Sequence, residues 1–306
     1  MNSNSLSASP SPALRRALVL GGGGSTGNAW LIGVVAGLDA GGLDVTDAEL
    51  TIGTSAGATA AAQLAGARPG ELYDAALAPL PARPRPQATS GDRSHARTAV
   101  HDHLDRMHRL IDASRDAAEL RRRVGAAALE LPGSNGPARQ SQWRATVAAR
   151  LPEPGWPERA VLLTAIDADT GEPVAFDRRS GVELVDAVAA SCSSGFAYAI
   201  GEHRYLDGGF RSNAENADLA AGHDRVLVLS PFGGRSLTPI EWGTHLSTQL
   251  DELRARGSLV ETIFPGRDAE HLFGADAMDL SLRPAAARAG YEQGVALAAR
   301  LRPFWA

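Results

Sequence analysis

The chain has 306 residues and a net charge of −5, with 44% hydrophobic and 21% charged residues, as is ordinary for a globular protein. All 30 residues counted as Lys+Arg are arginine, which excludes a P-loop lysine, a Schiff-base lysine and a Ser-Lys dyad. The negative charge argues against nucleic acid as a partner, because a phosphate backbone selects for a basic surface.

The N-terminal segment, the apolar content and the single cysteine indicate where the protein is expected to reside. Residues 1–14 are rich in Ser, Asn and Pro without the apolar run of a signal peptide, so we predict a disordered tail ahead of one domain over residues 15–306. No window has the apolar length needed to cross a bilayer. Cys192 has no second cysteine to form a disulfide with. These features predict a cytoplasmic protein and leave contact with a membrane surface open.

Two strand–loop–helix units open the domain. Residues 17–20 form a short apolar run that ends in four glycines, and helical spacing continues over residues 28–40. Residues 50–52 form a second strand, which ends in Gly53-Thr54-Ser55-Ala56-Gly57 before an alanine-rich helix that runs to about residue 64. Consecutive units of this kind predict neighbouring parallel strands in an α/β sheet with helices on both faces.

The remainder of the chain contains an insertion and then returns to the α/β pattern. Between about residues 81 and 151 the sequence becomes rich in Arg and charged, and we predict a helical cap or insertion over the sheet. Further strands are expected at residues 160–165, 173–176 and 226–229, and helices at 182–190, 241–256 and 284–301. Asp207-Gly208-Gly209 stands between these elements, after Tyr205-Leu206.

The first glycine loop, residues 21–27, has a G-x-G-x-x-G spacing at Gly22, Gly24 and Gly27. Dinucleotide binding expects an acidic residue at the end of the second strand, where the Gly53 loop stands instead. A Walker loop needs a lysine after its last glycine, where Asn28 stands. The remaining use of the loop is to offer backbone N–H groups at a helix N-terminus to a negative charge.

The second loop matches G-x-S-x-G between a strand and a helix, the context of a nucleophile elbow, so Ser55 is a candidate nucleophile. Neighbouring parallel strands open at the same edge of the sheet, which would place the glycine loop beside Ser55 as a source of oxyanion donors. A serine hydroxyl also needs a base. Asp207 and His223 are both candidates, and the pattern alone leaves both open. His223 precedes the strand at residues 226–229, which favours a surface position at a helix end.

Other reactive side chains favour structural interpretations. His101, Asp105 and His108 share a helical face and are compatible with metal ligation, but a solvated helix face is favoured and no metal site is predicted. Cys192 has no histidine near it in the sequence, so packing in a tight turn is favoured over a nucleophilic role.

The glycine loop, G-x-S-x-G and Asp-Gly-Gly together resemble the patatin-like phospholipase family, whose three motifs occur here in the family's order. The resemblance implies a three-layer fold with a central, mostly parallel sheet and a helical cap. It implies a Ser55–Asp207 dyad that acts without histidine and without a cofactor. The residues it assigns to the oxyanion hole are Gly22, Gly23 and Gly24, and the other motif glycines are Gly27, Gly53, Gly57, Gly208 and Gly209.

The family's activity is hydrolysis of carboxylic esters in phospholipids, lysophospholipids or neutral lipids, so the resemblance implies a lipid or acyl-ester substrate for this chain. The sequence departs from the family pattern in two places. Thr26 stands where Arg or Lys is common, and the stretch from Ala190 to Gly195 lacks the family's proline. An asparagine commonly follows Asp-Gly-Gly, and either Asn213 or Asn216 matches it. A Ser-His-Asp esterase and a non-catalytic lipid-binding module remain alternatives.

Overall fold

The computed structural model describes residues 14–78, 104–131 and 136–306. Within them a single sheet contains the strands β1 (Arg16–Leu20), β2 (Leu50–Gly53), β3 (Ala160–Asp167), β4 (Pro173–Phe176), β5 (Tyr198–Ile200), β6 (His203–Asp207), β7 (Arg225–Leu229) and β8 (Leu259–Ile263). The named α-helices are α1 (Gly24–Ala40), α2 (Ala56–Gly66), α3 (Pro69–Leu77), α5 (Ala117–Leu129), α6 (Pro137–Ala148), α7 (Leu184–Ser191), α8 (Leu246–Ala255) and α9 (Arg283–Trp305).

The sheet is mostly parallel. Its strand order is β5-β6-β3-β2-β1-β7-β8, and β4 pairs with β3 beside this path. Neighbours from β3 to β8 are parallel, whereas β4 and β6 run antiparallel to β3. The predicted parallel pairing of the first two strands is confirmed, and the loops that follow them open at one edge because parallel strands share a direction.

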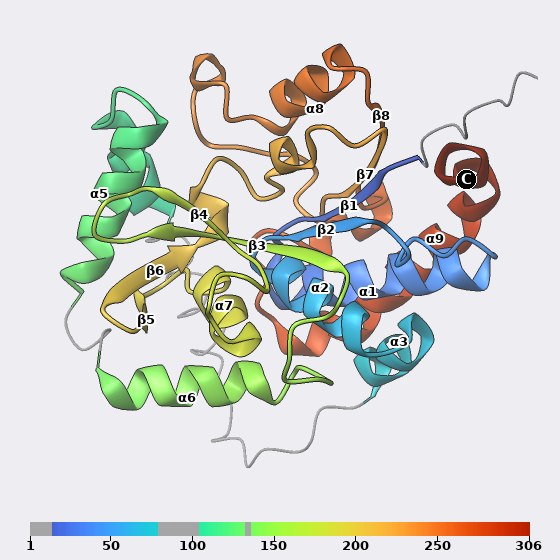
Figure 1. Cartoon of the computed structure of the whole chain (residues 1–306), viewed down its shortest axis with the longest axis horizontal. Helices are drawn as coiled ribbons and strands as arrows, with labels where there is room; N and C mark the ends of the chain where they lie inside the picture. The colour runs from blue at the N-terminus through green and yellow to red at the C-terminus, as the bar shows by residue number, and fades with distance from the viewer. Residues whose placement is uncertain (1–13, 79–103, 132–135) are drawn as a thin grey trace, which may run out of the picture.

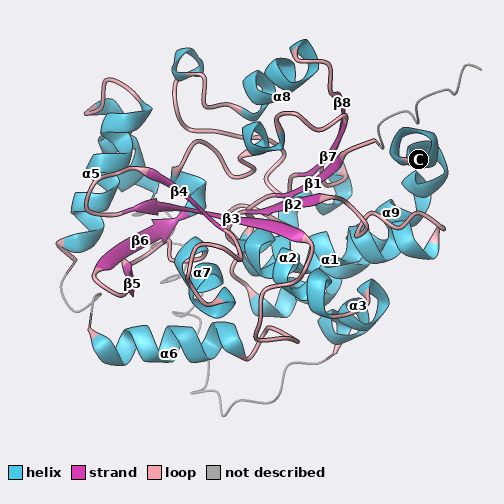
Figure 2. Cartoon of the chain, in the orientation of Figure 1, coloured by secondary structure: helices cyan, strands magenta, loops and turns pink. Residues whose placement is uncertain are grey.

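Helices cover both faces of the sheet (Figures 1 and 2). Alternate residues of β1 divide between the two layers, as the two-residue period of a strand requires. Leu18 and Leu20 belong to the apolar cluster that contains α1 residues, whereas Ala17 and Val19 belong to the cluster that contains α8 residues. The predicted three-layer α/β architecture is therefore confirmed.

Helices α1 and α9 pack against one another through glycines. A Cβ atom on Gly33 of α1 would lie 2.2 Å from the carbonyl oxygen of Ala287, and one on Gly290 of α9 would lie 2.4 Å from that of Trp30. Neither backbone oxygen can move away without disrupting its helix, so only glycine fits at these positions. This close packing fixes the start of α9 beside the start of α1, next to the glycine loop.

Several boundaries differ from the predicted ones. Helix α1 begins at Gly24, four residues earlier than expected, because the Gly27 N–H already donates to the Gly23 carbonyl at 2.9 Å. The helix expected over residues 241–256 is a short 3₁₀ turn, Ile240–Trp242, followed by the shorter α8. Helix α3 and strands β5 and β8 were not predicted.

Residues 1–13 of the predicted tail lie outside the described residues, as do residues 81–103 and 132–135 of the predicted cap. Leu14 and the cap segments 104–131 and 136–151 are described. Helix α5 packs Leu120 and Val124 into a cluster with Ile166 of β3 and Leu206 of β6. Figure 1 shows α5 and α6 at the end of the sheet that carries β5 and β6. In the parts of the chain that the structure describes, no helix is long and apolar enough to span a bilayer.

Candidate active site

Ser55 sits on a sharp turn between β2 and α2. Its backbone has φ 53° and ψ −114°, a positive-φ conformation that costs energy for a residue with a side chain. The turn brings its flanks so close that a Cβ on Gly57 would lie 1.8 Å from the Leu20 carbonyl oxygen, and one on Gly53 would lie 2.7 Å from the Ala58 Cα. Two glycines thus permit the strained turn that carries the serine.

The sheet register brings Asp207 to the same level as Ser55. Strand β2 pairs Gly53 with Leu163 of β3, and β6 pairs Asp207 with Ala165 of β3. Ser55 follows Gly53 by two residues, just as Ala165 follows Leu163. The serine and the carboxylate therefore lie at matching heights on the two sides of β3.

The Asp207 carboxyl is buried and held in a defined orientation. Only 5% of the residue is exposed, and its Oδ1 accepts a hydrogen bond from the Gly209 N–H at 2.8 Å. Burial raises the pKa of Asp207 to about 6, although hydrogen bonds from the Gly209 N–H and the Ser55 side chain both lower it. A carboxylate with this pKa is a stronger base than one in water and is still largely ionised at neutral pH.

The glycine loop lies against the same turn, but its first predicted donor is engaged. A Cβ on Gly22 would lie 3.6 Å from the Ser55 Cβ, so the two backbones are close neighbours. The Gly22 N–H donates to the Ala214 carbonyl at 2.7 Å, so this predicted oxyanion donor already has a backbone acceptor. The N–H groups of Gly23 and Gly24 have no acceptor among the described residues. Gly24 has φ +62°, which a side chain would strain.

His223 lies at the N-terminal ends of the parallel strands, whereas Ser55 lies at their C-terminal ends. It precedes β7, whose final residue Leu229 is level with Leu20 at the edge that carries Ser55. A five-residue strand is about 16 Å long, so His223 is too far from Ser55 to act as its base. Its Nδ1 bonds the Ala220 carbonyl at 3.0 Å at the end of a 3₁₀ turn, as the predicted helix-end position requires. With 8% exposure it is buried, so its predicted surface position is wrong.

Ser191 and Cys192, at the C-terminal end of α7, form hydrogen bonds with the backbone of Ser55. Ser191 Oγ accepts a hydrogen bond from the Ser55 N–H at 3.0 Å, and the Cys192 thiol donates to the Ser55 carbonyl at 3.0 Å. Burial raises the pKa of Cys192 to about 12, and the charge of Asp207 adds to this increase. The thiol is therefore protonated and unreactive at neutral pH, in agreement with the favoured packing role.

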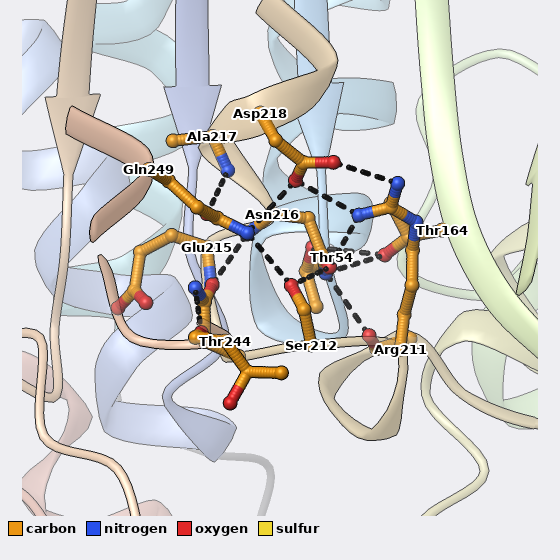
Figure 3. A network of polar contacts seen from close by, with 12 residues as sticks. Thr54, Thr164, Arg211, Ser212, Glu215, Asn216, Ala217, Asp218, Thr244 and Gln249 are labelled. Carbon is orange, nitrogen blue, oxygen red and sulfur yellow. Dashed lines mark hydrogen bonds and ion pairs between the residues drawn. The ribbon is translucent and has the colours of Figure 1, made fainter. Parts of the chain in front are cut away.

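A buried asparagine connects the serine turn to the Asp207 loop (Figure 3). The Asn216 amide Nδ2 donates to the Thr54 hydroxyl and to the Gly208 carbonyl, each at 3.0 Å. Thr54 also shares a hydrogen bond of 2.8 Å with Thr164 of β3. Asn216 is fully buried and holds φ 56°, a left-handed conformation that asparagine tolerates better than most residues. Of the two asparagines that match the family pattern, Asn216 is the one that contacts both loops.

Residues 18–219 match the family model described as "Patatin-like phospholipase", which covers more than half of the chain. The chain belongs to the patatin-like phospholipase family. Membership supports lipid acyl hydrolase activity in general terms. No curated protein sequence matches the chain.

Solved structures of two bacterial proteins are similar to this patatin-like phospholipase. VipD from Legionella pneumophila is 13% identical with a TM-score of 0.44, and the match covers 95% of this chain and 67% of VipD. The type III effector protein ExoU is 15% identical with a TM-score of 0.37, over 96% of this chain and 54% of ExoU. ExoU from Pseudomonas aeruginosa in complex with SpcU gives 18% identity, a TM-score of 0.32, and coverages of 93% and 53%. The chain thus spans about half the length of ExoU.

A pocket with both apolar and polar lining lies beside the glycine loop of this patatin-like phospholipase. Its volume is about 210 Å³, and its apolar lining is Pro231, Phe232, Phe264, Pro265 and Phe273. Pro231 packs on the loop so closely that a Cβ on Gly23 would lie 2.6 Å from its side chain. The pocket also contains the polar residues Arg235 and Glu270.

The structure brings together no metal-ligating cluster among the residues that it describes. His101, one of the three residues with the helical spacing of a metal site, lies outside those residues. The motif glycines Gly208 and Gly209 lie directly after Asp207, where a Cβ on Gly208 would overlap the Thr164 hydroxyl at 2.0 Å. Ser55, Asp207 and the glycine loop are therefore the sequence-predicted residues that meet at one edge of the sheet.

Proposed function

We propose that the chain hydrolyses the carboxylic ester of an acyl lipid through a covalent acyl intermediate on Ser55, with Asp207 as the general base. The observation that carries this proposal is that the Ser55 hydroxyl lies near enough to the buried Asp207 carboxyl to lower its pKa, while burial raises that pKa to about 6. A hydroxyl and a carboxylate in contact form the smallest set of groups that can activate a serine.

In the acylation step, the Ser55 oxygen attacks the ester carbonyl carbon while its proton passes to Asp207. The negative charge that forms on the carbonyl oxygen is stabilised by the N–H groups of Gly23 and Gly24. The bond from the carbonyl carbon to the alcohol oxygen then breaks, and Asp207 returns its proton to the leaving alcohol. Asp207 next takes a proton from water, whose oxygen attacks the acyl-serine carbonyl carbon. The bond from that carbon to the Ser55 oxygen then breaks, Asp207 returns the proton to Ser55, and the fatty acid leaves.

Apolar surface near the glycine loop supports a lipid substrate. Phe264 is 42% exposed, Met278 71% and Leu280 46%, and all three follow the end of β8 at the edge that carries Ser55. The sulfur of Met278 would lie 3.0 Å from a Cβ on Gly24, next to the proposed oxyanion donors. We propose that this edge faces the lipid aggregate during turnover, which would make contact with a membrane peripheral.

Ester hydrolysis by the purified chain tests the proposal. Wild type, Ser55→Ala and the control Ser194→Ala, whose serine is exposed in the same region, are assayed with p-nitrophenyl butyrate and with a lysophospholipid. We expect Ser55→Ala to lose at least about 1000-fold in kcat, because the covalent route disappears. The control should retain wild-type turnover. No wild-type turnover of either ester would favour the non-catalytic lipid-binding module.

A further inference from the structure

Arg283, the first residue of α9, is a half-buried arginine without a carboxylate partner among the described residues. Its Nη1 donates to the Ser25 carbonyl at 3.0 Å and to the Asn28 Oδ1 at 3.3 Å, and its Nη2 reaches the same Oδ1 at 3.3 Å. All of these acceptors are neutral. Burial lowers the pKa of Arg283, and the positive charge of Arg150 lowers it further, which indicates a second cation nearby.

A chain of hydrogen bonds leads from Arg283 to Arg150. The Asn28 amide donates to the Gln63 side chain at 2.9 Å, and Gln63 in turn donates to the Arg150 carbonyl at 3.1 Å. The Arg150 guanidinium lies 5.8 Å from the centre of the Trp143 ring and likewise forms no ion pair with a described carboxylate. Neither arginine forms an ion pair with a described carboxylate, and the effect of Arg150 on the pKa of Arg283 places the two cations in the same region.

This region adjoins the proposed catalytic groups. Ser25, which accepts from Arg283, directly follows Gly24 of the glycine loop. Asn28 also contacts the carbonyl of Ala56, the residue after Ser55, at 3.4 Å. Arg283 is therefore linked to the immediate neighbours of both the proposed oxyanion loop and the proposed nucleophile.

Partial burial of a cation without a carboxylate is unfavourable, and an anionic ligand that accepts from the guanidinium offsets this cost. In a glycerophospholipid the phosphate and the acyl ester are attached to the same glycerol unit, so a phosphate site must lie close to the nucleophile. We propose that Arg283, assisted by Arg150, binds the phosphate of the lipid substrate and makes the enzyme prefer phospholipids to neutral esters. This inference rests on the proposed function and adds the residue that selects the substrate class.

Two substrates with the same acyl chain and the same ester test the inference. 1-Palmitoyl-lysophosphatidylcholine and 1-palmitoylglycerol differ only in the phosphocholine group, and both are assayed in the same detergent micelles. We expect Arg283→Gln to lower kcat/KM for the lysophospholipid by about 10- to 100-fold, the loss typical of a charge-assisted hydrogen bond. The rate with 1-palmitoylglycerol should stay within about twofold of wild type. Arg283→Lys should restore part of the lysophospholipid rate.

Arg288→Gln is the matched control, because Arg288 is an exposed arginine five residues further along α9. It should leave both substrates unchanged. Equal losses on both substrates in Arg283→Gln would show that Arg283 only secures α9 against α1 and would overturn the inference, as would no loss on either. If wild type cleaves 1-palmitoylglycerol but has no preference for the lysophospholipid, the inference fails while the proposed function stands.

A free phosphate is the other source of the same chemistry. Inorganic phosphate is therefore added to the 1-palmitoylglycerol reaction of wild type and Arg283→Gln. Weak competitive inhibition of wild type alone, together with the substrate preference above, agrees with a headgroup site. Strong inhibition by inorganic phosphate without any change in substrate preference would overturn the headgroup assignment in favour of a site for the free anion.

Discussion

The side-chain amide of Asn216 donates a hydrogen bond to the hydroxyl of Thr54 at 3.0 Å (Figure 3). Thr54 directly precedes Ser55, and the same amide holds the carbonyl of Gly208, which directly follows Asp207. One buried side chain therefore contacts the neighbours of both proposed catalytic residues. We infer that Asn216 helps to position the hydroxyl of Ser55 relative to the carboxylate of Asp207.

Removal of this amide should reduce turnover more than stability. Asn216→Gly accepts the left-handed φ of 56° but has no side chain, and Asn216→Asp keeps the shape but replaces the donor with an oxygen. We expect kcat to fall about 10- to 100-fold in both variants with KM little changed, because a displacement of about 1 Å in reacting groups has costs of this size. Steady-state kinetics with a melting curve for each variant measure this. Wild-type kcat in Asn216→Gly would contradict a positioning role.

The two candidate bases should respond to substitution in opposite ways. Asp207→Asn keeps the size of the side chain but cannot accept the serine proton, so we expect turnover of p-nitrophenyl butyrate to be abolished. His223→Ala lies at the far edge of the sheet and should spare most of the turnover, with some loss of stability because His223 is buried. Kinetics of the two purified variants decide between them. Loss of activity in His223→Ala alone would restore a histidine-dependent triad.

The pKa of Asp207 predicts the acid limb of the pH–rate profile. The free enzyme needs the ionised carboxylate, and burial raises its pKa to about 6. We therefore expect kcat/KM to rise about tenfold per pH unit below pH 6 and to level off above it. Profiles from pH 4 to pH 8 in wild type measure this, with Ser194→Ala as a control that should give the same curve. An acid limb centred near pH 4, the range of a solvent-exposed aspartate, would contradict the buried base.

Glu215 predicts a loss of stability as pH rises. It is fully buried beside the glycine loop, and burial raises its pKa to about 7, although a hydrogen bond of 2.6 Å from Ser230 opposes the shift. A carboxyl with a raised pKa stabilises the fold below its unfolded pKa of 4.5 and loses that contribution as pH rises through about 7. A shift of this size corresponds to about 3 kcal/mol. Urea unfolding at pH 4.5 and pH 8 should show wild type losing stability relative to Glu215→Gln, and parallel behaviour of the two would contradict it.

Much of the fold could be predicted from local sequence patterns. Apolar runs that end in glycines identified β1 and β2, and G-x-S-x-G placed Ser55 at the start of a helix. Strand β8 could not be predicted because Glu261 and Thr262 interrupt its apolar pattern. It is an edge strand, so one of its two long sides has no neighbouring strand and its residues need not all be buried. The glycines of α1 and α9 carry no local signal for their interlocking, since it depends on a partner helix more than 250 residues away.

The candidate site also contains residues that short motifs predict and residues that depend on tertiary contacts. Ser55, Asp207 and the glycine loop could be found because each motif has its own short signature. The engagement of the Gly22 N–H could not, because its acceptor Ala214 comes from a loop nearly 200 residues later in the chain. The family pattern indicated an asparagine after Asp-Gly-Gly, but only its tertiary contacts separate Asn216 from Asn213. Arg283 carried no sequence signal, since its role depends on the packing of α9 beside α1.

Active-site labelling tests the central claim most directly, because it requires both the serine and its activation. Wild type, Asp207→Asn and His223→Ala are treated with a fluorophosphonate, and the modified peptide is identified by mass spectrometry. We predict a single adduct on Ser55 in wild type, formed at nearly the same rate in His223→Ala and at least about 100-fold more slowly in Asp207→Asn. No adduct on Ser55, or equal labelling rates in wild type and Asp207→Asn, would contradict the Ser55–Asp207 mechanism.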